Sequence, residues 1–221
     1  MQGQDENVYQ DRRRAMRLYE AKMAPYPRRV KIYLAEKGVE LERVEVDLHG
    51  RENRSAAFLN KNPSGKIPVL ELDDGAFLPE SAAIMEYLEE IYPSPPMLGE
   101  TPEQRAQTRA TDRIASEIFT VLAQMLMHTH PAARQFHPEL VQHRQVGEAL
   151  QPLVDQLFDQ LEERIGDRSF LAGLRPTVAD CTLFALIDTV SLGFGYVLPE
   201  RCPRLRAWYR RFQERPSAKI M

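Results

Sequence analysis

The fold is decided by residues 62–90, which read NPSGKIPVLELDDGAFLPESAAIMEYLEE. Residues 68–72 predict a short buried strand, and Asp74 with Gly75 is a hairpin signal that leads into a second strand over 76–78. Ser81 is a residue type that caps helices, and apolar residues follow it at helical spacing: Ile84, Met85, Leu88 and Ile91. The stretch therefore predicts two antiparallel strands followed by a helix that ends before Pro93.

The residues before this stretch predict two more strands with a helix between them. Residues 17–20 form the first strand, a helix opens at Pro27 and closes at Gly38, and a second strand covers 41–46. A short helix spans 55–59. The order is βαβαββα, in which the helical crossover makes the first two strands parallel and the hairpin makes the last two antiparallel. This is a small α/β domain with a mixed sheet.

The second half of the chain lacks strand-like alternation. Prolines punctuate residues 93–102, and apolar residues then recur at helical spacing in two long segments, in a third over about 178–192 and in a last one around Trp208. Residues 177–180, TVAD, fit a capping box at the start of the third helix. We therefore expect a loose extension over 1–15, an α/β domain over 16–93, a linker over 94–102 and an all-α helical bundle over 103–221.

Composition excludes several classes of protein. Among 221 residues, 29 Lys and Arg face 32 Asp and Glu, a net charge of −3, whereas proteins that wrap DNA need a large positive excess. Arg12, Arg13 and Arg14 are interpreted as part of a solvated tail. The sequence has neither a run of ~20 apolar residues nor an apolar signal-peptide core, so the expected compartment is the cytoplasm. Cys181 and Cys202 are too few for a disulfide framework, and both are expected to be reduced and buried.

Histidine spacing argues against a metal site. His128 and His130 are two residues apart, so a helix directs them to different sides. His137 and His143 lie in a segment interrupted by proline. No metal is expected.

Three places carry potential for chemistry, and the first is Ile67 with Pro68. A proline at the head of a strand indicates either an ordinary strand start or a cis bond in a tight turn. A cis bond would direct the Ile67 backbone outward, where its N–H and C=O pair with an extended peptide.

The second place is the pair Glu80 and Ser81 at a helix start. The Ser81 hydroxyl and the N–H groups of the first turn form a site for a carboxylate, and Glu80 is placed to hold an ammonium. Together they match the head of a free amino acid. The alternative is a plain helix cap beside a surface acid.

The third place is the start of the first helix, residues 24–27, APYP. A helix N-terminus carries partial positive charge and lowers the pKa of a nearby thiol from its usual ~8.5. Pro25 and Pro27 have no N–H, so Tyr26 is the expected donor.

Several ordered motifs resemble those of the cytosolic glutathione S-transferases, with N-terminal motifs of the bacterial, theta-like or nu-like type. They are PRRVKIYLAEKG at 27–38, NPSGKIPVLELDDG at 62–75, PESAAIMEYLEE at 79–90 and FLAGLRPTVADCTLFA at 170–185. The resemblance implies a thioredoxin-like N-terminal domain, an all-helical C-terminal domain, a homodimer, and conjugation of reduced glutathione to a small hydrophobic electrophile.

The same resemblance assigns roles to individual residues. It implies that the glutathione cysteine pairs with the backbone of Ile67 beside Pro68 and that Glu80 and Ser81 hold the γ-glutamyl end. Asn53, Arg54 and Lys66 fall where relatives receive the glycine carboxylate. Cations near Lys66 and an acid at Glu80 complement a tripeptide with two carboxylates and one ammonium.

One position departs from the family pattern. Many relatives carry Ser, Thr or Cys where this chain has Ala24, so a mechanism through a protein cysteine is disfavoured. Thiolate stabilisation then has to come from the Tyr26 N–H, from the Tyr26 phenol or from the helix dipole, with Tyr19 a weaker candidate. Phe119 and Met125 are candidates for the electrophile pocket, although core packing explains them equally well. A non-catalytic glutathione-binding or regulatory protein, and a glutathione-dependent peroxidase or disulfide-bond reductase, are the alternative functions.

Overall fold

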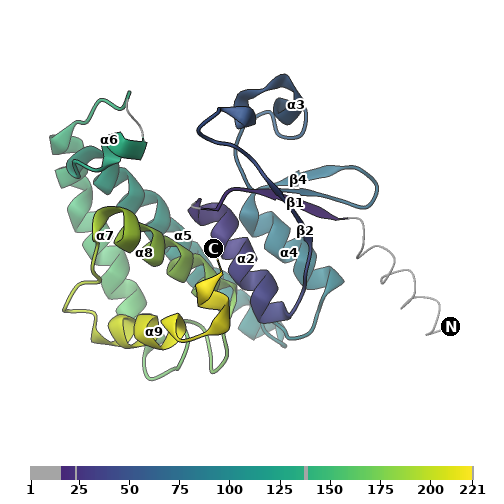
Figure 1. Cartoon of the computed structure of the whole chain (residues 1–221). Helices are drawn as coiled ribbons and strands as arrows, with labels where there is room; N and C mark the ends of the chain where they lie inside the picture. The colour runs from purple at the N-terminus through teal and green to yellow at the C-terminus, as the bar shows by residue number, and fades with distance from the viewer. Residues whose placement is uncertain (1–15, 23, 137–138, 221) are drawn as a thin grey trace. The chain divides into compact units, whose positions relative to one another are not determined.

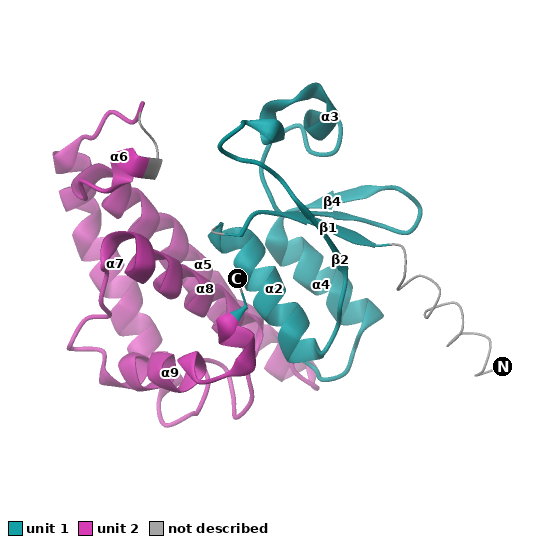
Figure 2. Ribbon diagram, viewed as in Figure 1, with its two compact units in different colours: residues 1–97, 220–221 teal, residues 98–219 magenta. Residues whose placement is uncertain are grey.

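The computed structural model describes residues 16–22, 24–136 and 139–220. It divides into two compact units, residues 1–97 with 220–221 and residues 98–219 (Figure 2). The predicted extension over 1–15, with Arg12, Arg13 and Arg14, lies outside the described residues, as does His137.

The first unit is built on a four-stranded mixed sheet (Figure 1). Its strands lie in the order β2-β1-β3-β4, with β1 parallel to β2 and antiparallel to β3, and β3 antiparallel to β4. This confirms the predicted α/β fold and the βαβαββα order. The elements are β1 (Arg17–Glu20), α2 (Pro25–Lys37), β2 (Glu42–Glu45), η1 (Glu52–Arg54), α3 (Ala56–Leu59), β3 (Val69–Glu71), β4 (Phe77–Pro79) and α4 (Ser81–Ile91).

The two faces of the sheet carry different cores, because successive residues of a strand point to opposite sides. Leu18 and Leu70 are opposite each other across β1 and β3, and both are fully buried. Tyr19 and Val69 form the next pair, on the other face, where Phe58 of α3 packs against them. The helices α2 and α4 contact each other and run side by side in Figure 1.

Two helix starts differ from the sequence-based expectation. Helix α2 begins at Pro25 rather than Pro27, since the fixed φ of Pro25 suits the first helical position equally well. Ser81 was expected to cap α4, and this expectation is wrong: Glu80 occupies the cap position and Ser81 is the first helical residue, with no side-chain capping bond. Gly38 ends α2, as predicted, and its φ of +65 is in the left-handed region that favours glycine.

The second unit is all-helical, which confirms the expected architecture. Its elements are α5 (Pro102–Thr129), α6 (Ala133–Phe136), α7 (Arg144–Ile165), α8 (Val178–Phe194), α9 (Pro203–Gln213) and η2 (Pro216–Lys219). Helix α5 contacts both α7 and α8. The buried faces of these helices are mostly apolar, so their packing supplies most of the unit's stability.

The capping box at the start of α8 is confirmed and extends into a buried network. The Asp180 carboxylate accepts hydrogen bonds from the N–H and hydroxyl of Thr177, from the Leu171 N–H and from Trp208 Nε1, at 2.7 to 2.9 Å. Burial raises the pKa of Asp180 to about 6, and these four donors oppose that shift. The network joins α8, the preceding loop and α9.

Cys181 and Cys202 are both free thiols and buried, as expected. In the described part of the chain, no helix combines the length and apolar character needed to cross a membrane. Among the same residues, no group of three or more potential ligands could hold a metal ion.

Candidate functional site

The chemistry-bearing residues of the first unit gather at one end of its sheet. Val69, the first residue of β3, is opposite both Tyr19 near the end of β1 and Pro79 at the end of β4. The segments that enter or leave these strands therefore lie at the same end of the sheet. They are Ile67–Pro68 before β3, Glu80 after β4, and Ala24 after β1. The Ile67–Pro68 peptide bond is cis, one of the two forms the sequence allows.

The start of α4 forms the first part of this candidate site. Glu80 is exposed and has φ +71 and ψ +110, a conformation that non-glycine residues adopt only when the surrounding structure imposes it. Ser81, the next residue, is 2% exposed. The first N–H groups of a helix have no partner within the helix, so this start offers donors to an anion beside an exposed carboxylate.

Arg29 of α2 is a residue that sequence reasoning missed. Its Nε donates a hydrogen bond of 2.8 Å to Ser81 Oγ, and its side chain is 4% exposed. With one lone pair of Ser81 engaged by Arg29, the serine O–H is left to donate elsewhere. The only sequence signal was that Arg29 is a basic residue among the buried positions of a helix. This signal is weak, because long basic side chains on such helices commonly extend to the surface.

The second part of the site is the turn over residues 62–66. Asn53 Nδ2 donates to the Gly65 carbonyl at 2.7 Å, and Arg54 Nη1 donates to the Ser64 carbonyl at 3.1 Å. Gly65 has φ +64, and a Cβ there would lie 2.7 Å from Arg54 Nη1 and 2.8 Å from the Asn53 carbonyl oxygen, so this close approach requires glycine. The structure therefore brings Asn53 and Arg54 to the turn that leads into Lys66.

Lys66 itself is exposed, and its backbone is fixed on both sides. Its carbonyl accepts from Asn62 Nδ2 at 2.8 Å, and its N–H donates to Ser64 Oγ at 3.3 Å. The lysine side chain is thus carried on an ordered turn, one residue before Ile67. The arrangement places exposed positive charge at the head of β3, while Glu80 places negative charge at the end of β4.

The start of α2 forms the third part. Ala24 is the cap residue and contributes no side-chain hydrogen bond, and Pro25 precedes Tyr26 in the first turn. The Tyr26 side chain is 41% exposed, and the Arg29 guanidinium lies 5.6 Å from the centre of its ring. Arg29 therefore contacts two of the residues selected from the sequence, Ser81 and Tyr26.

Tyr19, the weaker candidate, has a structural role. Its hydroxyl donates to Glu71 Oε2 at 2.7 Å, and its ring packs edge-on against Phe58 and Phe77. Arg17 also donates to Glu71, at 2.7 Å, and lowers the pKa of that carboxyl. The Tyr19 phenol belongs to this cluster on the α3 face of the sheet.

Phe119 and Met125 lie in α5 of the second unit, where both are buried, at 3% and 7% exposed. The structure thus shows them as core residues of a helix. Their assignment to an electrophile pocket stays a prediction.

Comparison with known proteins identifies the family. The family model described as "Glutathione S-transferase, N-terminal domain" matches residues 18–96, and "Glutathione S-transferase, C-terminal domain" matches 144–211. A yeast relative, Glutathione S-transferase 2 of Saccharomyces cerevisiae, is 33% identical over 208 residues, covering 92% of this chain and 88% of the relative. The chain belongs to the glutathione S-transferase family.

Other members extend this comparison. A Pseudomonas aeruginosa protein named maleylacetoacetate isomerase is 34% identical, covering 86% of this transferase-family chain and 88% of the relative. The crystal structure of a glutathione S-transferase domain-containing protein from Marinobacter aquaeolei has a TM-score of 0.82 at 32% identity, covering 92% of this chain and all of that chain. Gtt2 from Saccharomyces cerevisiae has a TM-score of 0.78 at 31% identity, with 92% and 98% covered.

Proposed function

We propose that this member of the glutathione S-transferase family binds reduced glutathione at the sheet end of its first unit and conjugates it, through its sulfur, to a small hydrophobic electrophile. The observation that carries the proposal is that three side chains lie at one end of the sheet: the exposed acid Glu80, the buried hydroxyl of Ser81 and the exposed Lys66. We expect the protein to act in the cytoplasm as a homodimer.

The charges of glutathione match this arrangement in order. The γ-glutamyl carboxylate would accept from the Ser81 hydroxyl and the first N–H groups of α4, and the ammonium would face Glu80. The backbone of the glutathione cysteine would pair with Ile67 beside Pro68, as in the addition of a strand to a sheet edge. At the far end, Lys66, Asn53 and Arg54 would receive the glycine carboxylate.

Arg29 supports this proposal by fixing the direction of the Ser81 hydroxyl. Its bond to Ser81 Oγ makes the oxygen an acceptor on the buried side, so that its proton is directed to the ligand. The positive charge of Arg29 also lies near the expected carboxylate. We therefore assign Arg29 as a positioning residue that acts through Ser81.

Activation of the thiol is proposed at the start of α2. The glutathione thiol loses its proton to solvent, and the thiolate is stabilised by the partial positive charge of the helix start and by Tyr26. The thiolate then attacks the electrophilic carbon, a C–S bond forms, and a leaving group such as chloride departs. Phe119 and Met125 are proposed for the apolar surface that holds the electrophile.

Turnover with a chloronitrobenzene in the presence of glutathione tests this function. Formation of the thioether with saturation in both substrates is expected. Glutathione binding without turnover would instead favour the non-catalytic alternative. Reduction of a hydroperoxide or of a mixed disulfide, without conjugation, would favour the peroxidase or reductase alternative.

A second candidate is an isomerase that uses glutathione without consuming it. It is favoured by the relative named maleylacetoacetate isomerase, whose identity to this chain is 34%. The consumption of glutathione distinguishes the two reactions. Loss of maleylacetoacetate with no loss of glutathione indicates isomerisation, whereas conjugation consumes one glutathione for each product.

A further inference from the structure

Helix α9 carries positive charge for which the proposed function has no use. Its residues, Pro203–Gln213, include four arginines and no acidic side chain: Arg204, Arg206, Arg210 and Arg211. Around this helix, residues 200–219 contain seven Lys and Arg against two Glu, whereas the whole chain has 29 against 32. Every residue proposed for glutathione belongs to the unit over 1–97, and α9 belongs to the unit over 98–219. Such a local excess of positive charge in an acidic chain is typical of a surface that binds an anionic partner.

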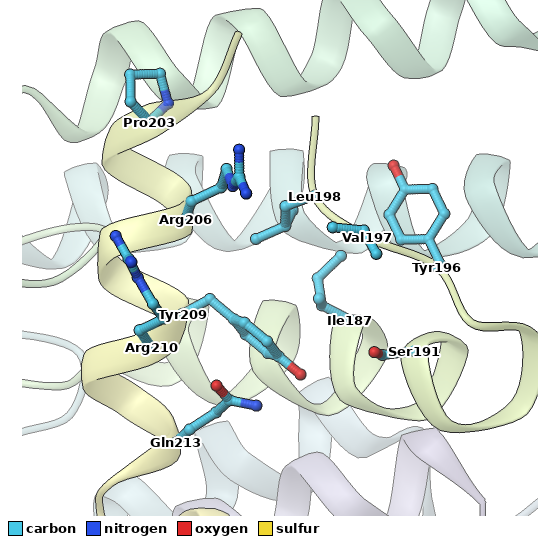
Figure 3. Close-up of a pocket in the computed structure, with 10 residues that line it drawn as sticks. All are labelled: Ile187, Ser191, Tyr196, Val197, Leu198, Pro203, Arg206, Tyr209, Arg210 and Gln213. Carbon is cyan, nitrogen blue, oxygen red and sulfur yellow. The ribbon is translucent and has the colours of Figure 1, made fainter. Parts of the chain in front are cut away.

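The arginines lie on the outer side of α9. The apolar residues of the helix are fully buried and hold it on its unit: Leu205, Trp208 and Phe212. Arg204 and Arg210 are exposed, and Arg206 is half-buried. Figure 3 shows Arg206 and Arg210, four residues apart, extending from the helix. These guanidinium groups are therefore accessible to another molecule.

Three of the four arginines are open to a partner. Arg211 is engaged, because its Nε and Nη2 donate to the Ser169 carbonyl at 3.1 and 2.7 Å. Arg204, Arg206 and Arg210 have no ion pair and no side-chain hydrogen bond to any residue that the structure describes. We refer to these three side chains as the α9 basic face.

Two features of the α9 basic face are unfavourable for the helix itself. Arg204 lies in the first turn, where the positive end of the helix dipole repels a cation. The acid at this helix start comes from α7 instead: Glu162 accepts from the N–H groups of Arg204 and Leu205, at 2.9 Å each. Arg206 and Arg210 are four residues apart, a spacing at which like charges repel each other. An anionic partner would offset both unfavourable interactions.

We propose that the α9 basic face docks an acidic segment of another protein, whose Asp and Glu carboxylates pair with Arg204, Arg206 and Arg210. A guanidinium pairs with a carboxylate through two parallel hydrogen bonds, which a lysine ammonium does not offer, and the cations of α9 are all arginines. A helix of 11 residues is about 16 Å long, so an acidic segment of about three helical turns spans the face.

Other anionic partners fit this surface less well. A helix that lies on a membrane inserts an exposed apolar face, whereas the apolar face of α9 is buried in its own unit. A nucleic acid carries a charge at every phosphate and extends beyond a face of about 16 Å. Next to the start of α9 it would meet Asp155 and Asp159 of α7, two carboxylates that share the cation of Arg201. A short acidic segment avoids this repulsion.

Fluorescence anisotropy of the full-length protein with a labelled acidic peptide tests the proposal. The probe is a fluorescein-labelled peptide of about 12 residues in which Glu and Ala alternate, and the same peptide with Gln in place of Glu is the neutral probe. The wild-type protein is expected to bind the glutamate peptide in preference to the glutamine peptide, with an affinity that falls as salt is added. The variant Arg204→Gln with Arg206→Gln and Arg210→Gln is expected to bind the glutamate peptide at least about tenfold more weakly.

A matched control removes the same charge elsewhere. Arg43, Arg134 and Arg175 are exposed and lie outside α9, so Arg43→Gln with Arg134→Gln and Arg175→Gln is expected to keep the wild-type affinity for the glutamate peptide. Circular dichroism is expected to show the wild-type helical content in both triple variants. Saturating glutathione is expected to leave the peptide bound to the wild-type protein.

Four results would overturn the proposal. The first is a variant of the α9 basic face that binds the glutamate peptide as tightly as the wild type, and the second is an equal loss of affinity in the control variant. The third is displacement of the peptide by glutathione. The fourth is tighter binding of a single-stranded oligothymidylate of equal charge, or of phosphatidylserine vesicles, that is lost in the variant of the α9 basic face, because the partner would then be a nucleic acid or a membrane.

Discussion

The Nε atom of Arg29 lies 2.8 Å from the Oγ atom of Ser81, although the two residues are 52 positions apart in the chain. Both side chains are almost completely buried, at 4% and 2% exposed. In such surroundings a charge-assisted hydrogen bond is strong, and the loss of either partner is costly. The bond links α2, where the thiol is proposed to lie, with α4, where the γ-glutamyl end is proposed to bind.

Substitution Ser81→Ala tests this link. Its expected effects are a glutathione affinity about tenfold weaker and a free energy of unfolding lower by about 1–3 kcal/mol, because Arg29 Nε loses its buried acceptor. Calorimetry with glutathione and chemical denaturation measure the two quantities. Thr101→Ala is the matched control: Thr101 caps α5 through the Gln104 N–H at 3.2 Å, so this variant is expected to lose about 1 kcal/mol with unchanged affinity.

A double-mutant cycle separates positioning from simple destabilisation. Arg29→Lys keeps the charge and removes the Nε donor, so it is expected to weaken glutathione binding on its own and to add little in the Ser81→Ala background. At saturating glutathione its turnover is expected to stay near that of the wild type. Additive losses from the two substitutions would show that Arg29 does not act through Ser81.

We predict that Glu80 strengthens glutathione binding but lowers the free energy of unfolding. Because its φ of +71 suits glycine, Glu80→Gly is expected to keep or raise the free energy of unfolding by up to about 1 kcal/mol while weakening glutathione binding. Denaturation and calorimetry again provide the measurements. Glu80→Gln, which removes only the charge, is expected to weaken binding with no gain in stability. A marked loss of stability in the glycine variant would argue against backbone strain at this position.

We expect a serine in place of Ala24 to increase activity. A hydroxyl at the cap of α2 would donate to the glutathione sulfur, so Ala24→Ser is expected to lower the pKa of the bound thiol by about 1 unit and to raise turnover. Ultraviolet absorbance of the thiolate against pH measures the first effect. Ala24→Val adds a side chain without a donor and is expected to produce neither change. Equal effects of Ser and Val would exclude the hydroxyl as the cause.

We expect Glu71 to make the free energy of unfolding depend on pH. The Arg17 guanidinium, with a further donor from Tyr19, lowers the pKa of the Glu71 carboxyl below its ordinary 4.5 in the folded state. Its stabilising contribution is therefore present above pH 4.5 and lost as the pH falls through the folded pKa. Wild type is expected to exceed Glu71→Gln in free energy of unfolding at neutral pH, with the difference shrinking in acid. A difference that stays constant with pH would contradict this.

Local patterns predicted the architecture well for physical reasons. Asp74 and Gly75 favour a tight hairpin, and the Thr177 and Asp180 pair defines a helix start through neighbouring backbone groups. The prediction that Ser81 caps α4 was wrong because a helix cap is defined by backbone conformation, and residue type did not show that Glu80 adopts a positive φ at that position. The partnership of Arg29 with Ser81 was missed because no local pattern relates two side chains that meet only through the fold.

The central claim is that the sheet end recognises the γ-glutamyl group of glutathione through Glu80 and the Arg29-supported Ser81. Calorimetric titration of the wild-type protein with glutathione and with cysteinylglycine, which lacks that group, tests it most directly. We predict saturable binding of glutathione at millimolar concentration or below, and binding of cysteinylglycine at least about tenfold weaker. Equal affinity for the two compounds, or no binding of glutathione, would contradict the account.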